Sequence, residues 1–426
     1  MDEQVLKHII SEGQDLLQRV TFYPRPMRWE AAGRYVLVGI RQAGKSYMLY
    51  QRARQLMAEG HDVREMLLVN FDDERLLGMK AAELDLLLQA YASMYAHRPI
   101  LLLDEIQQVE GWEHFARRMA NQKYMVYITG SNARMLSRDI ATTLGGRFLE
   151  QRVYPFSFLE YVGARMEQPL DLRSSHWQYG AQRDALRRLF ADYLRWGGFP
   201  ELLLFTDKRQ WLNALYDKIL LGDVVQRNRL RGVQAVRLCL KRLAESLRQP
   251  TAYTRLSHLL KSTGLNTSAS SVVDYVTYAK EACILFSLDN HASKFTEKET
   301  IKKHYFADNG LLNIFLTGGE TSLLENLCAV HLHRLYGDEL GFYRSNEEVD
   351  FLLPEAGIAV QACYSLADVT TFEREVNALR KLHMREPHLR LQIVTNDEER
   401  QITLPDGQCI EVVPAWKWLL TTERIA

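Results

Sequence analysis

The segment Gly39–Ser46, which reads Gly-Ile-Arg-Gln-Ala-Gly-Lys-Ser, constrains the fold of this chain more than any other feature. It matches the pattern GxxxxGK[ST] in full, follows an apolar run at Tyr35–Val38 and precedes a helical stretch at Tyr47–Ala58. Glycines let backbone N–H groups turn inward around a phosphate, and the N-terminus of the next helix adds positive potential. We therefore predict a strand, a phosphate-binding loop and a helix. The alternative is a chance glycine-rich turn, which the flanking strand and helix disfavour.

The residue types within this loop predict individual contacts. Lys45 is expected to reach the β- and γ-phosphates, and Ser46 is expected to ligate Mg²⁺. The residues expected to line the nucleotide are Gly39, Ile40, Arg41, Gln42, Ala43, Gly44, Lys45, Ser46 and Tyr47. The predicted cofactors are therefore a nucleoside triphosphate and Mg²⁺.

A second motif, Pro99-Ile-Leu-Leu-Leu-Asp-Glu, ends an apolar run with two acids. We expect Asp104 to support the Mg²⁺ ion and Glu105 to polarise the attacking water, which favours hydrolysis over binding alone. The alternative is a strand that simply ends in a solvated acidic turn. Asp72 and Asp73 follow another apolar run and could support Mg²⁺ or cap a helix, and the cap is favoured.

Two further segments carry candidate functional side chains. Ser131 and Asn132 follow the apolar run Tyr124–Ile128, so either could contact the γ-phosphate or the water as a sensor, or could cap the next helix. Both interpretations stay open. Arg147 follows a Gly-Gly turn and could reach the γ-phosphate of a neighbouring subunit as an arginine finger. A surface ion pair is the alternative, and the sequence by itself favours it.

Short apolar runs alternate with helical stretches over the first third of the chain, as in a doubly wound α/β fold with a parallel sheet. The runs are Tyr35–Val38, Glu65–Asn70, Ile100–Leu103 and Tyr124–Ile128. Residues 1–30 read as a helix with Leu6, Ile9, Ile10, Leu16 and Leu17 on one face. With 426 residues, two or three domains are expected.

Composition excludes several classes of protein. Lys+Arg and Asp+Glu both total 53, so net charge does not indicate a partner. The five cysteines are scattered without CxxC spacing, which disfavours structural zinc and a disulfide framework. Without a run of about 18 apolar residues or a signal peptide, we expect no membrane association and a cytoplasmic location.

The later part of the chain shows a different pattern. Residues 180–250 look mainly helical, with a Gly-Gly-Phe-Pro turn at 197–200. The order of elements over 251–310 resembles a winged helix, with two short helices, a third at Ser268–Ala282, and strands at Cys283–Asp289 and Lys302–Ala307. From about Ser322 the pattern predicts a helix, strands at Gly341–Arg344, Val349–Leu353 and Ile358–Cys363, a helix at Thr371–Leu382 and a strand at Leu389–Thr395.

Taken together, these residues resemble a large family of bacterial and archaeal AAA-type ATPases whose C-terminal half is a domain of unknown function. The similar segments are the loop Gly39–Ser46, Leu101–Gln107, Thr129–Asn132, Leu144–Arg147, Tyr154–Tyr161, Tyr193–Leu202 and Tyr305–Gly310. The resemblance implies ATP as the nucleotide and a homo-oligomer, for which a hexameric ring is one candidate arrangement. It also favours the sensor role of Ser131 or Asn132 and the action of Arg147 in trans.

The sequence pattern and the resemblance together predict five regions along the chain. These are a helical lead-in at 1–30, a P-loop ATPase core at 31–160, a helical lid or linker at 161–250, a winged-helix-like domain at 251–315 and a nuclease-fold-like domain at 316–426.

The tail resembles restriction-endonuclease-like domains, with Glu325 on its first helix and Asp350 on a strand. Such enzymes use Glu-x-Lys on the next strand, but this chain has Gln361 and Cys363 at those positions. Gln is a poor metal ligand and Cys cannot replace the ammonium, so we predict an inactive remnant of the fold. An ion pair with Arg344 is the alternative role for Asp350.

A local excess of basic residues suggests contact with nucleic acid. Residues 221–250 contain Arg227, Arg229, Arg231, Arg237, Lys241, Arg242 and Arg248. Such a cluster could follow phosphates, but it could also be an ordinary solvated face. The candidate recognition helix at 268–280 has only Lys280 as a basic residue, and its Tyr275 and Tyr278 could pack inside instead.

The function predicted from the sequence is a Mg²⁺-dependent, oligomeric ATPase that couples hydrolysis to remodelling of a macromolecule, with DNA, including branched DNA, as the first candidate. The alternative is a slow nucleotide-gated switch or scaffold that acts on a protein partner. A third function, an ATP-dependent nuclease, is disfavoured by Gln361 and Cys363.

Overall fold

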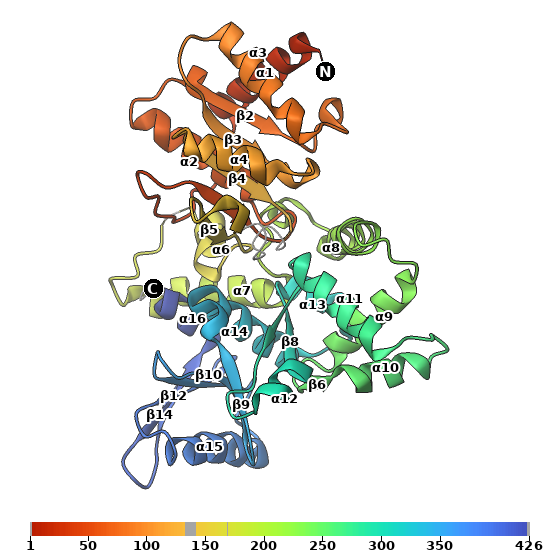
Figure 1. The fold of residues 1–426 in the computed structure, drawn as a ribbon. Coiled ribbons are helices and arrows are strands. Elements are labelled where there is room, and N and C mark those ends of the chain that lie inside the picture. Colours follow the sequence, from red (N-terminus) through yellow and green to blue (C-terminus); the bar gives the residue numbers. More distant parts are fainter. Residues whose placement is uncertain (1, 133–141, 168, 424–426) are drawn as a thin grey trace. The chain divides into compact units, whose positions relative to one another are not determined.

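The structure, a computed structural model, describes residues 2–132, 142–167 and 169–423 (Figure 1). The chain divides into two compact units, residues 1–154 with 281–283, and residues 155–280 with 284–426. Each unit is described by itself. None of the described helices is long and apolar enough to cross a membrane. All five cysteines are free thiols.

The first unit is built on a five-stranded parallel sheet in the order β2-β3-β4-β1-β5. Its strands are β1 (Tyr35–Val38), β2 (Met66–Asn70), β3 (Ile100–Asp104), β4 (Val126–Gly130) and β5 (Leu149–Arg152). The first four strands are buried almost throughout, which explains their apolar sequences. β5 lies at the edge with every residue exposed, so its sequence Leu-Glu-Gln-Arg lacks the apolar signal by which the other strands were predicted.

β4 extends two residues further than predicted. The sequence suggested a strand that ends at Ile128, but Thr129 and Gly130 continue the ladder, in which Gly130 is paired with Val38 of β1. The prediction failed because threonine and glycine in a strand resemble a turn when only their propensities are considered. β4 lies between β1 and β3, as expected if its polar end lies between the two nucleotide motifs.

Helices flank this sheet. They are α1 (Glu3–Arg19), α2 (Lys45–Ala58), α3 (Leu84–Met94) and α4 (Trp112–Asn121), with 3-10 turns at Val63–Glu65, Glu74–Leu76, Ala81–Glu83 and Ile106–Gln108. Leu6, Ile9 and Ile10 of α1 belong to the apolar core of this unit. The N-terminal helix is therefore part of the first unit's core. Leu16 is 40% exposed, so its predicted place on the buried face was wrong, whereas Leu17 is fully buried.

The second unit begins with helices. They are α6 (Phe158–Arg165), α7 (Gly180–Trp196), α8 (Lys208–Lys218), α9 (Val233–Glu245), α10 (Tyr253–Lys261), α11 (Ala269–Glu281), α12 (Phe295–Thr300) and α13 (Asn309–Asn313). A π-helix spans Ile219–Gln226, and 3-10 turns span His176–Gln178 and Pro200–Leu204. A three-stranded antiparallel sheet has the order β6 (Thr251–Ala252), β8 (Ile301–Phe306) and β7 (Leu285–Leu288). One helix, α10, stands where two short helices were predicted before Ser268.

The Gly-Gly-Phe-Pro turn at 197–200 packs closely against Asp308. Asp308 accepts hydrogen bonds from the N–H groups of Gly198 (2.8 Å) and Gly310 (2.7 Å). Gly197 has φ +76°, and a Cβ there would lie 1.9 Å from Asp308 Oδ1, so only glycine fits. Burial raises the pKa of Asp308 to about 6, although these N–H groups oppose the shift. Two segments that marked the family resemblance therefore meet here for structural reasons.

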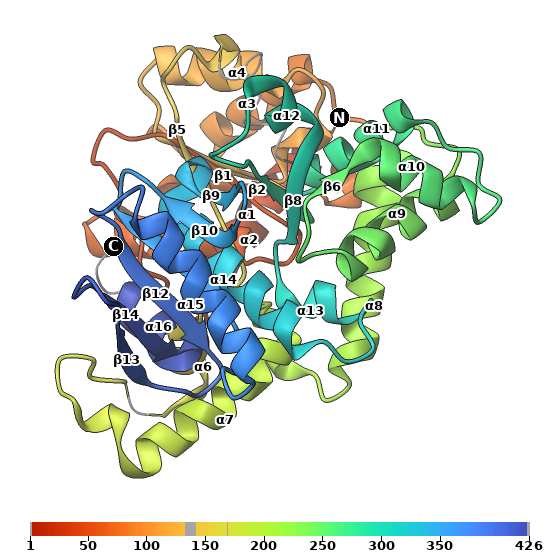
Figure 2. The same ribbon diagram turned by 90° about the horizontal axis from the view of Figure 1, so that it is seen from below.

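The rest of the second unit is a six-stranded sheet in the order β13-β14-β12-β11-β10-β9. Its strands are β9 (Gly341–Arg344), β10 (Glu348–Leu353), β11 (Ile358–Ala362), β12 (Arg390–Thr395), β13 (Arg400–Thr403) and β14 (Cys409–Pro414), and its helices are α14 (Glu320–Tyr336), α15 (Val369–His383) and α16 (Ala415–Glu423). A 3-10 turn at Gly337–Glu339 follows α14. β11, β12 and β14 are parallel, and α15 and α16 cover opposite faces (Figures 1 and 2). The elements predicted up to β12 are confirmed, whereas β13, β14 and α16 were not predicted.

Candidate functional site

The predicted phosphate loop connects β1 to α2 in the first unit. Gly39 lies so close to the chain after β5 that a Cβ would meet the carbonyl oxygen of Val153 at 2.0 Å. Gly44 precedes α2 in the left-handed region, with φ +95°, which glycine adopts without strain. Gln42 also has a positive φ of 59°, uncommon for a residue with a side chain. Backbone geometry therefore explains both glycines of the motif.

The Lys45 side chain folds back over this loop. It is only 3% exposed, and its Nζ donates to the carbonyl oxygens of Gly39 (3.1 Å) and Ile40 (3.0 Å). The same Nζ lies 3.5 Å from Oε1 of Glu105. The structure therefore brings the lysine of the first motif to the second acid of the second motif.

Asp104, the last residue of β3, is buried beside the loop and is 1% exposed. Burial raises its pKa to about 6, and the charge of Glu105 adds to the increase, while hydroxyl groups of Thr129 and Ser46 donate hydrogen bonds that oppose it. The hydrogen bond from Ser46 shows that the two predicted Mg²⁺ ligands are neighbours.

Glu105 follows β3 with a left-handed backbone, at φ +53°. Its N–H donates to Thr129 Oγ1 at 2.9 Å, and Gln107 Nε2 donates to its carboxylate at 2.5 Å. Burial alone would raise the pKa of Glu105, but Lys45, Gln107, Arg41 and Ser131 together hold it below its ordinary value. The carboxylate is therefore ionised at neutral pH, as a group that attracts a proton from water must be.

These residues fit a magnesium ion. Ser46 and Asp104 offer a hydroxyl and a carboxylate oxygen, which are hard ligands, and their mutual hydrogen bond places the two groups side by side. Within the described part of the chain, no group of three or more His, Cys, Asp or Glu residues could hold a metal. Two protein ligands are nevertheless sufficient for Mg²⁺ in a nucleotide site, since phosphates and waters complete its shell.

The candidate sensor residues lie after β4. Ser131 is 1% exposed, accepts a hydrogen bond from Gln107 Nε2 at 3.3 Å and lowers the pKa of Glu105, so it belongs to the cluster around that carboxylate. Asn132 is buried as well. The alternative role, a cap for the next helix, concerns residues 133–141, which lie outside the described part of the chain.

The remaining residues that the sequence singled out lie outside the cluster around Glu105. Arg147 is exposed, and its Nη1 donates to Gly145 O in its own turn at 3.0 Å. Tyr47 is half exposed on the first turn of α2. Asp73 caps the following 3-10 turn by accepting from Arg75 N at 2.9 Å, as favoured from the sequence. Asp72 lies 3.6 Å from Arg41 of the loop.

Sequence reasoning missed three residues at this site. Thr129 holds both acids, because it donates to Asp104 and accepts from the N–H of Glu105. Gln107 holds the carboxylate of Glu105, and Arg25 Nη1 donates to Ala43 O of the loop at 3.1 Å. The polar Thr129 inside an apolar strand was a usable signal. Arg25 offered none, since only the path of the chain brings it to the loop.

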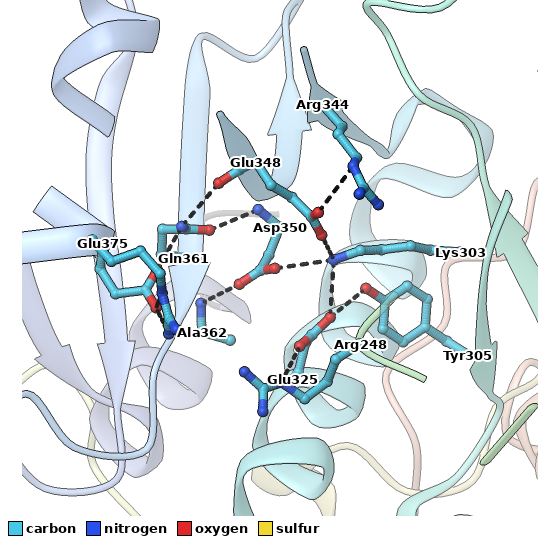
Figure 3. A network of polar contacts seen from close by, with 11 residues as sticks. Arg248, Lys303, Tyr305, Glu325, Arg344, Glu348, Asp350, Gln361, Ala362 and Glu375 are labelled. Atoms are coloured by element: carbon cyan, nitrogen blue, oxygen red, sulfur yellow. Dashed lines mark hydrogen bonds and ion pairs between the residues drawn. The ribbon is translucent and has the colours of Figure 1, made fainter. Parts of the chain in front are cut away.

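The second unit contains a buried ionic cluster around Lys303 of β8 (Figure 3). Lys303 is fully buried, and its Nζ lies 3.2 Å from Glu325, 2.8 Å from Glu348 and 3.0 Å from Asp350. Burial opposes the ammonium, but Glu325 and the other acids hold the pKa of Lys303 well above its ordinary value. The chain therefore supplies its own cation to these carboxylates. Sequence reasoning missed Lys303, which lies on a strand outside the tail.

The hydrogen bonds of the cluster explain its departures from the endonuclease pattern. The Gln361 amide accepts from Asp350 N at 2.7 Å and donates to Glu375 at 2.6 Å, so it links two strands and a helix (Figure 3). Cys363 is buried, and its thiol donates to Ser365 O. Arg344 lies 3.5 Å from Glu348, so the predicted pair of Arg344 with Asp350 was wrong, because Lys303 takes Asp350 as its partner. The predicted lack of nuclease activity stays a prediction.

Ion pairs within the second unit reduce the positive charge of the basic stretch at 221–250. The pairs are Arg227 with Asp223 (3.0 Å), Arg237 with Asp217 (2.8 Å), Arg242 with Glu245 (2.6 Å) and Arg248 with Glu325 (3.5 Å). In the ranges that the structure describes, Arg229, Arg231 and Lys241 have no carboxylate partner. On α11, Tyr275 and Tyr278 are half-buried.

Comparisons with known proteins found matching family models, relatives and solved structures. The model of a family described as an AAA domain matches residues 33–162, and that of a domain of unknown function, DUF8612, matches residues 187–322. An uncharacterized protein of Methanocaldococcus jannaschii is 31% identical over 401 residues, which cover 91% of this chain and 88% of that protein. An uncharacterized protein of Haemophilus influenzae is 27% identical over 396 residues, covering 90% and 94%. Among solved structures, the Walker-type ATPase of Pyrococcus abyssi matches with a TM-score of 0.40 and 16% identity, over 74% of this chain and 95% of that chain.

Proposed function

We propose that this chain, which belongs to a bacterial and archaeal family of AAA-type P-loop ATPases, binds ATP with Mg²⁺ and hydrolyses it. The observation that carries the proposal is the meeting of two motifs that lie far apart in the sequence. Lys45 lies 3.5 Å from Glu105, and Ser46 donates a hydrogen bond to Asp104. Both contacts occur at the carboxyl ends of parallel strands, where α/β sheets bind their ligands.

Each residue has a distinct task in the proposed reaction. The Lys45 ammonium and the N–H groups at the start of α2 bind the β- and γ-phosphates. Ser46 and Asp104 hold Mg²⁺, which neutralises phosphate charge when it is bound. The ionised Glu105 orients a water and accepts its proton as the water oxygen bonds to the γ-phosphorus and the P–O bond to the departing ADP breaks. Thr129 keeps Asp104 and Glu105 in place, and Ser131 and Asn132 are the candidate sensors of the γ-phosphate.

We further propose that a macromolecule, with DNA as the first candidate, is the target of this ATPase. The supporting observation is a set of basic side chains in the second unit, Arg229, Arg231 and Lys241, for which no carboxylate partner occurs among the described residues. Lysine and arginine side chains without such partners attract phosphates. The alternative remains a slow nucleotide-gated switch or scaffold that acts on a protein partner.

The ATPase rate across DNA structures separates these two functions. Single-stranded, double-stranded or branched DNA should raise the rate several-fold, because a remodelling ATPase couples turnover to its target. The double variant Arg231→Ala with Lys241→Ala should remove the stimulation by DNA and leave the basal ATPase rate unchanged. Arg173→Ala, at an exposed arginine outside the basic stretch, is the control and should keep both the stimulation and the basal rate. A slow rate that no DNA alters would contradict the DNA target and favour the switch.

Arg147 is the proposed arginine finger of an oligomer. Arg147 is exposed, and among the described residues its guanidinium donates only to the carbonyl oxygen of Gly145 in its own turn. An arginine placed in this way suits a residue that reaches a neighbouring subunit. Arg147→Ala should lower turnover on the order of 10³-fold. Mixing Arg147→Ala subunits with Lys45→Ala subunits should restore part of the activity, because each type supplies what the other lacks. Mixtures as inactive as their components, measured in an assembly shown to be mixed, would contradict action in trans.

A further inference from the structure

The second unit contains a cavity of about 920 Å³ that takes no part in the proposed ATPase site. Pockets of this size, within roughly 300–1,000 Å³, hold organic ligands. Three parallel strands point their carboxyl ends at it, because Tyr364 follows β11, Asn396 follows β12 and Trp416 follows β14. Open α/β sheets place their ligands at this edge. Residues of α7 line another side of the cavity. In the ribbon, α7 lies beside α14 and α16 (Figures 1 and 2).

Four arginine side chains line this cavity. Arg187, Arg188, Arg195 and Arg209 line it together with the acids Asp184, Glu320 and Asp397. Three of the four have partners, since Arg187 pairs with Asp397, Arg209 donates to the carbonyl oxygen of Ile314 at 3.2 Å, and the Arg195 guanidinium lies 5.1 Å from the centre of the Trp196 ring. Arg188 and Arg195 are exposed and have no carboxylate partner in the described ranges. Without a carboxylate partner, and with the Arg195 contact made only to a ring face, both guanidinium groups keep N–H donors for an anion.

Buried N–H donors at the same cavity lack partners. Asn313 is 9% exposed and Trp416 is 4% exposed, and both residues line the cavity. Asn313 Nδ2 and Trp416 Nε1 have no hydrogen-bond partner among the described residues. A buried donor without a partner costs about 1–3 kcal/mol, so such groups are usually reserved for a ligand or a water. Both nitrogen atoms are themselves covered by neighbouring atoms, so an anionic ligand is indicated by the arginine side chains that line the cavity.

A helix N-terminus also lines the cavity, and the Glu320 carboxylate in its first turn offsets part of its positive potential. Gly318, Gly319 and Glu320 line the cavity where α14 begins, and no side chain caps this helix of 17 residues. The free N–H groups of a helix N-terminus favour phosphate and similar anions. The remaining walls include the apolar side chains Phe190 and Leu323. Inorganic phosphate would leave such a large cavity mostly empty, so the ligand needs an organic body.

We propose that this cavity binds an organic phosphate of mononucleotide size, with Arg188 and Arg195 on its phosphoryl group. The phosphoryl group could belong to a free nucleotide or to the nucleotide at the 5′ end of a nucleic-acid strand. The site lies in the second unit and does not depend on the P-loop, so it stands even if ATP hydrolysis fails.

Isothermal titration calorimetry with AMP, and with adenosine as the phosphate-free comparison, tests the site in the full chain. The Lys45→Ala background removes binding at the P-loop. AMP should bind and adenosine should not. Arg188→Glu with Arg195→Glu should weaken AMP binding by more than about tenfold, because charged hydrogen bonds are lost. Arg255→Glu with Arg390→Glu, two exposed arginines elsewhere in the same unit, should leave it unchanged.

A second arm identifies the source of the phosphate. A tetranucleotide with a 5′-phosphate is compared with the same strand ending in a 5′-hydroxyl. Preference for AMP indicates a free nucleotide, and preference for the phosphorylated strand indicates a strand end; both support the site. If neither phosphate compound binds, or if the paired arginine variant binds as well as its control, the proposal is overturned.

Discussion

Lys45→Ala is expected to abolish ATP binding and hydrolysis together, whereas Glu105→Gln is expected to abolish hydrolysis alone. Lys45 supplies the charge that attracts the β- and γ-phosphates, and its Nζ already lies in the loop beside Gly39 O at 3.1 Å. Glu105 acts later, on the water, and glutamine cannot accept the proton. Loss of a general base lowers turnover by about 10²–10⁴-fold.

Two measurements separate these variants. Equilibrium binding of ATP should be lost in Lys45→Ala and retained in Glu105→Gln, while steady-state phosphate release should be lost in both. Glu110→Gln is the matched control, because Glu110 is exposed and lies outside the cluster. Full turnover in Lys45→Ala would refute the phosphate-loop assignment. Full turnover in Glu105→Gln would show instead that another group activates the water.

Lys303→Met is expected to destabilise the second unit by about 3–5 kcal/mol. Removing the buried ammonium leaves the neighbouring carboxylates without a compensating positive charge. Lys303 is fully buried, and its ammonium lies within 3.2 Å of Glu325 and 3.0 Å of Asp350. Methionine retains most of the volume, so the loss reports charge and not packing. The measurement is the unfolding transition of the second unit, monitored by hydrogen exchange in β8 and β10.

The matched control lies next to it in the same strand. Lys302 pairs with Asp289 at 2.9 Å near the surface, and Lys302→Met should cost about 0–1 kcal/mol. Neutralising the acids with Glu325→Gln and Asp350→Asn should recover part of the loss in Lys303→Met, as expected for residues that interact directly. If Lys303→Met cost no more than Lys302→Met, the cluster would not stabilise the fold as described.

Much of the fold could be predicted because its signals are local. The loop Gly39–Ser46 has a backbone requirement that glycine alone meets, and the buried strands β1 to β3 are continuous apolar runs. Edge strand β5 was missed because its exposed residues carry no apolar pattern. The prediction ended β4 two residues early, since its polar end is held in the sheet by pairing with β1 and not by propensity.

The candidate ATPase site was largely predictable for a related reason. Lys45, Asp104 and Glu105 each end or begin an element, and parallel strands bring their carboxyl ends to one edge of a sheet. Arg25 was not recognised, because its role depends on the path of the chain before β1. Thr129 was not assigned its role, although a polar residue at the end of an apolar strand was a usable signal.

The sequence by itself determined the phosphate loop, the two acids and the alternation of strands and helices, because each of these is recorded in neighbouring residues. Only the tertiary structure decided that Lys303 lies among Glu325, Glu348 and Asp350, and that α7, α14 and three strand ends enclose an arginine-lined cavity. The physical reason is that strand order and register decide which distant side chains meet, and a local pattern cannot encode them.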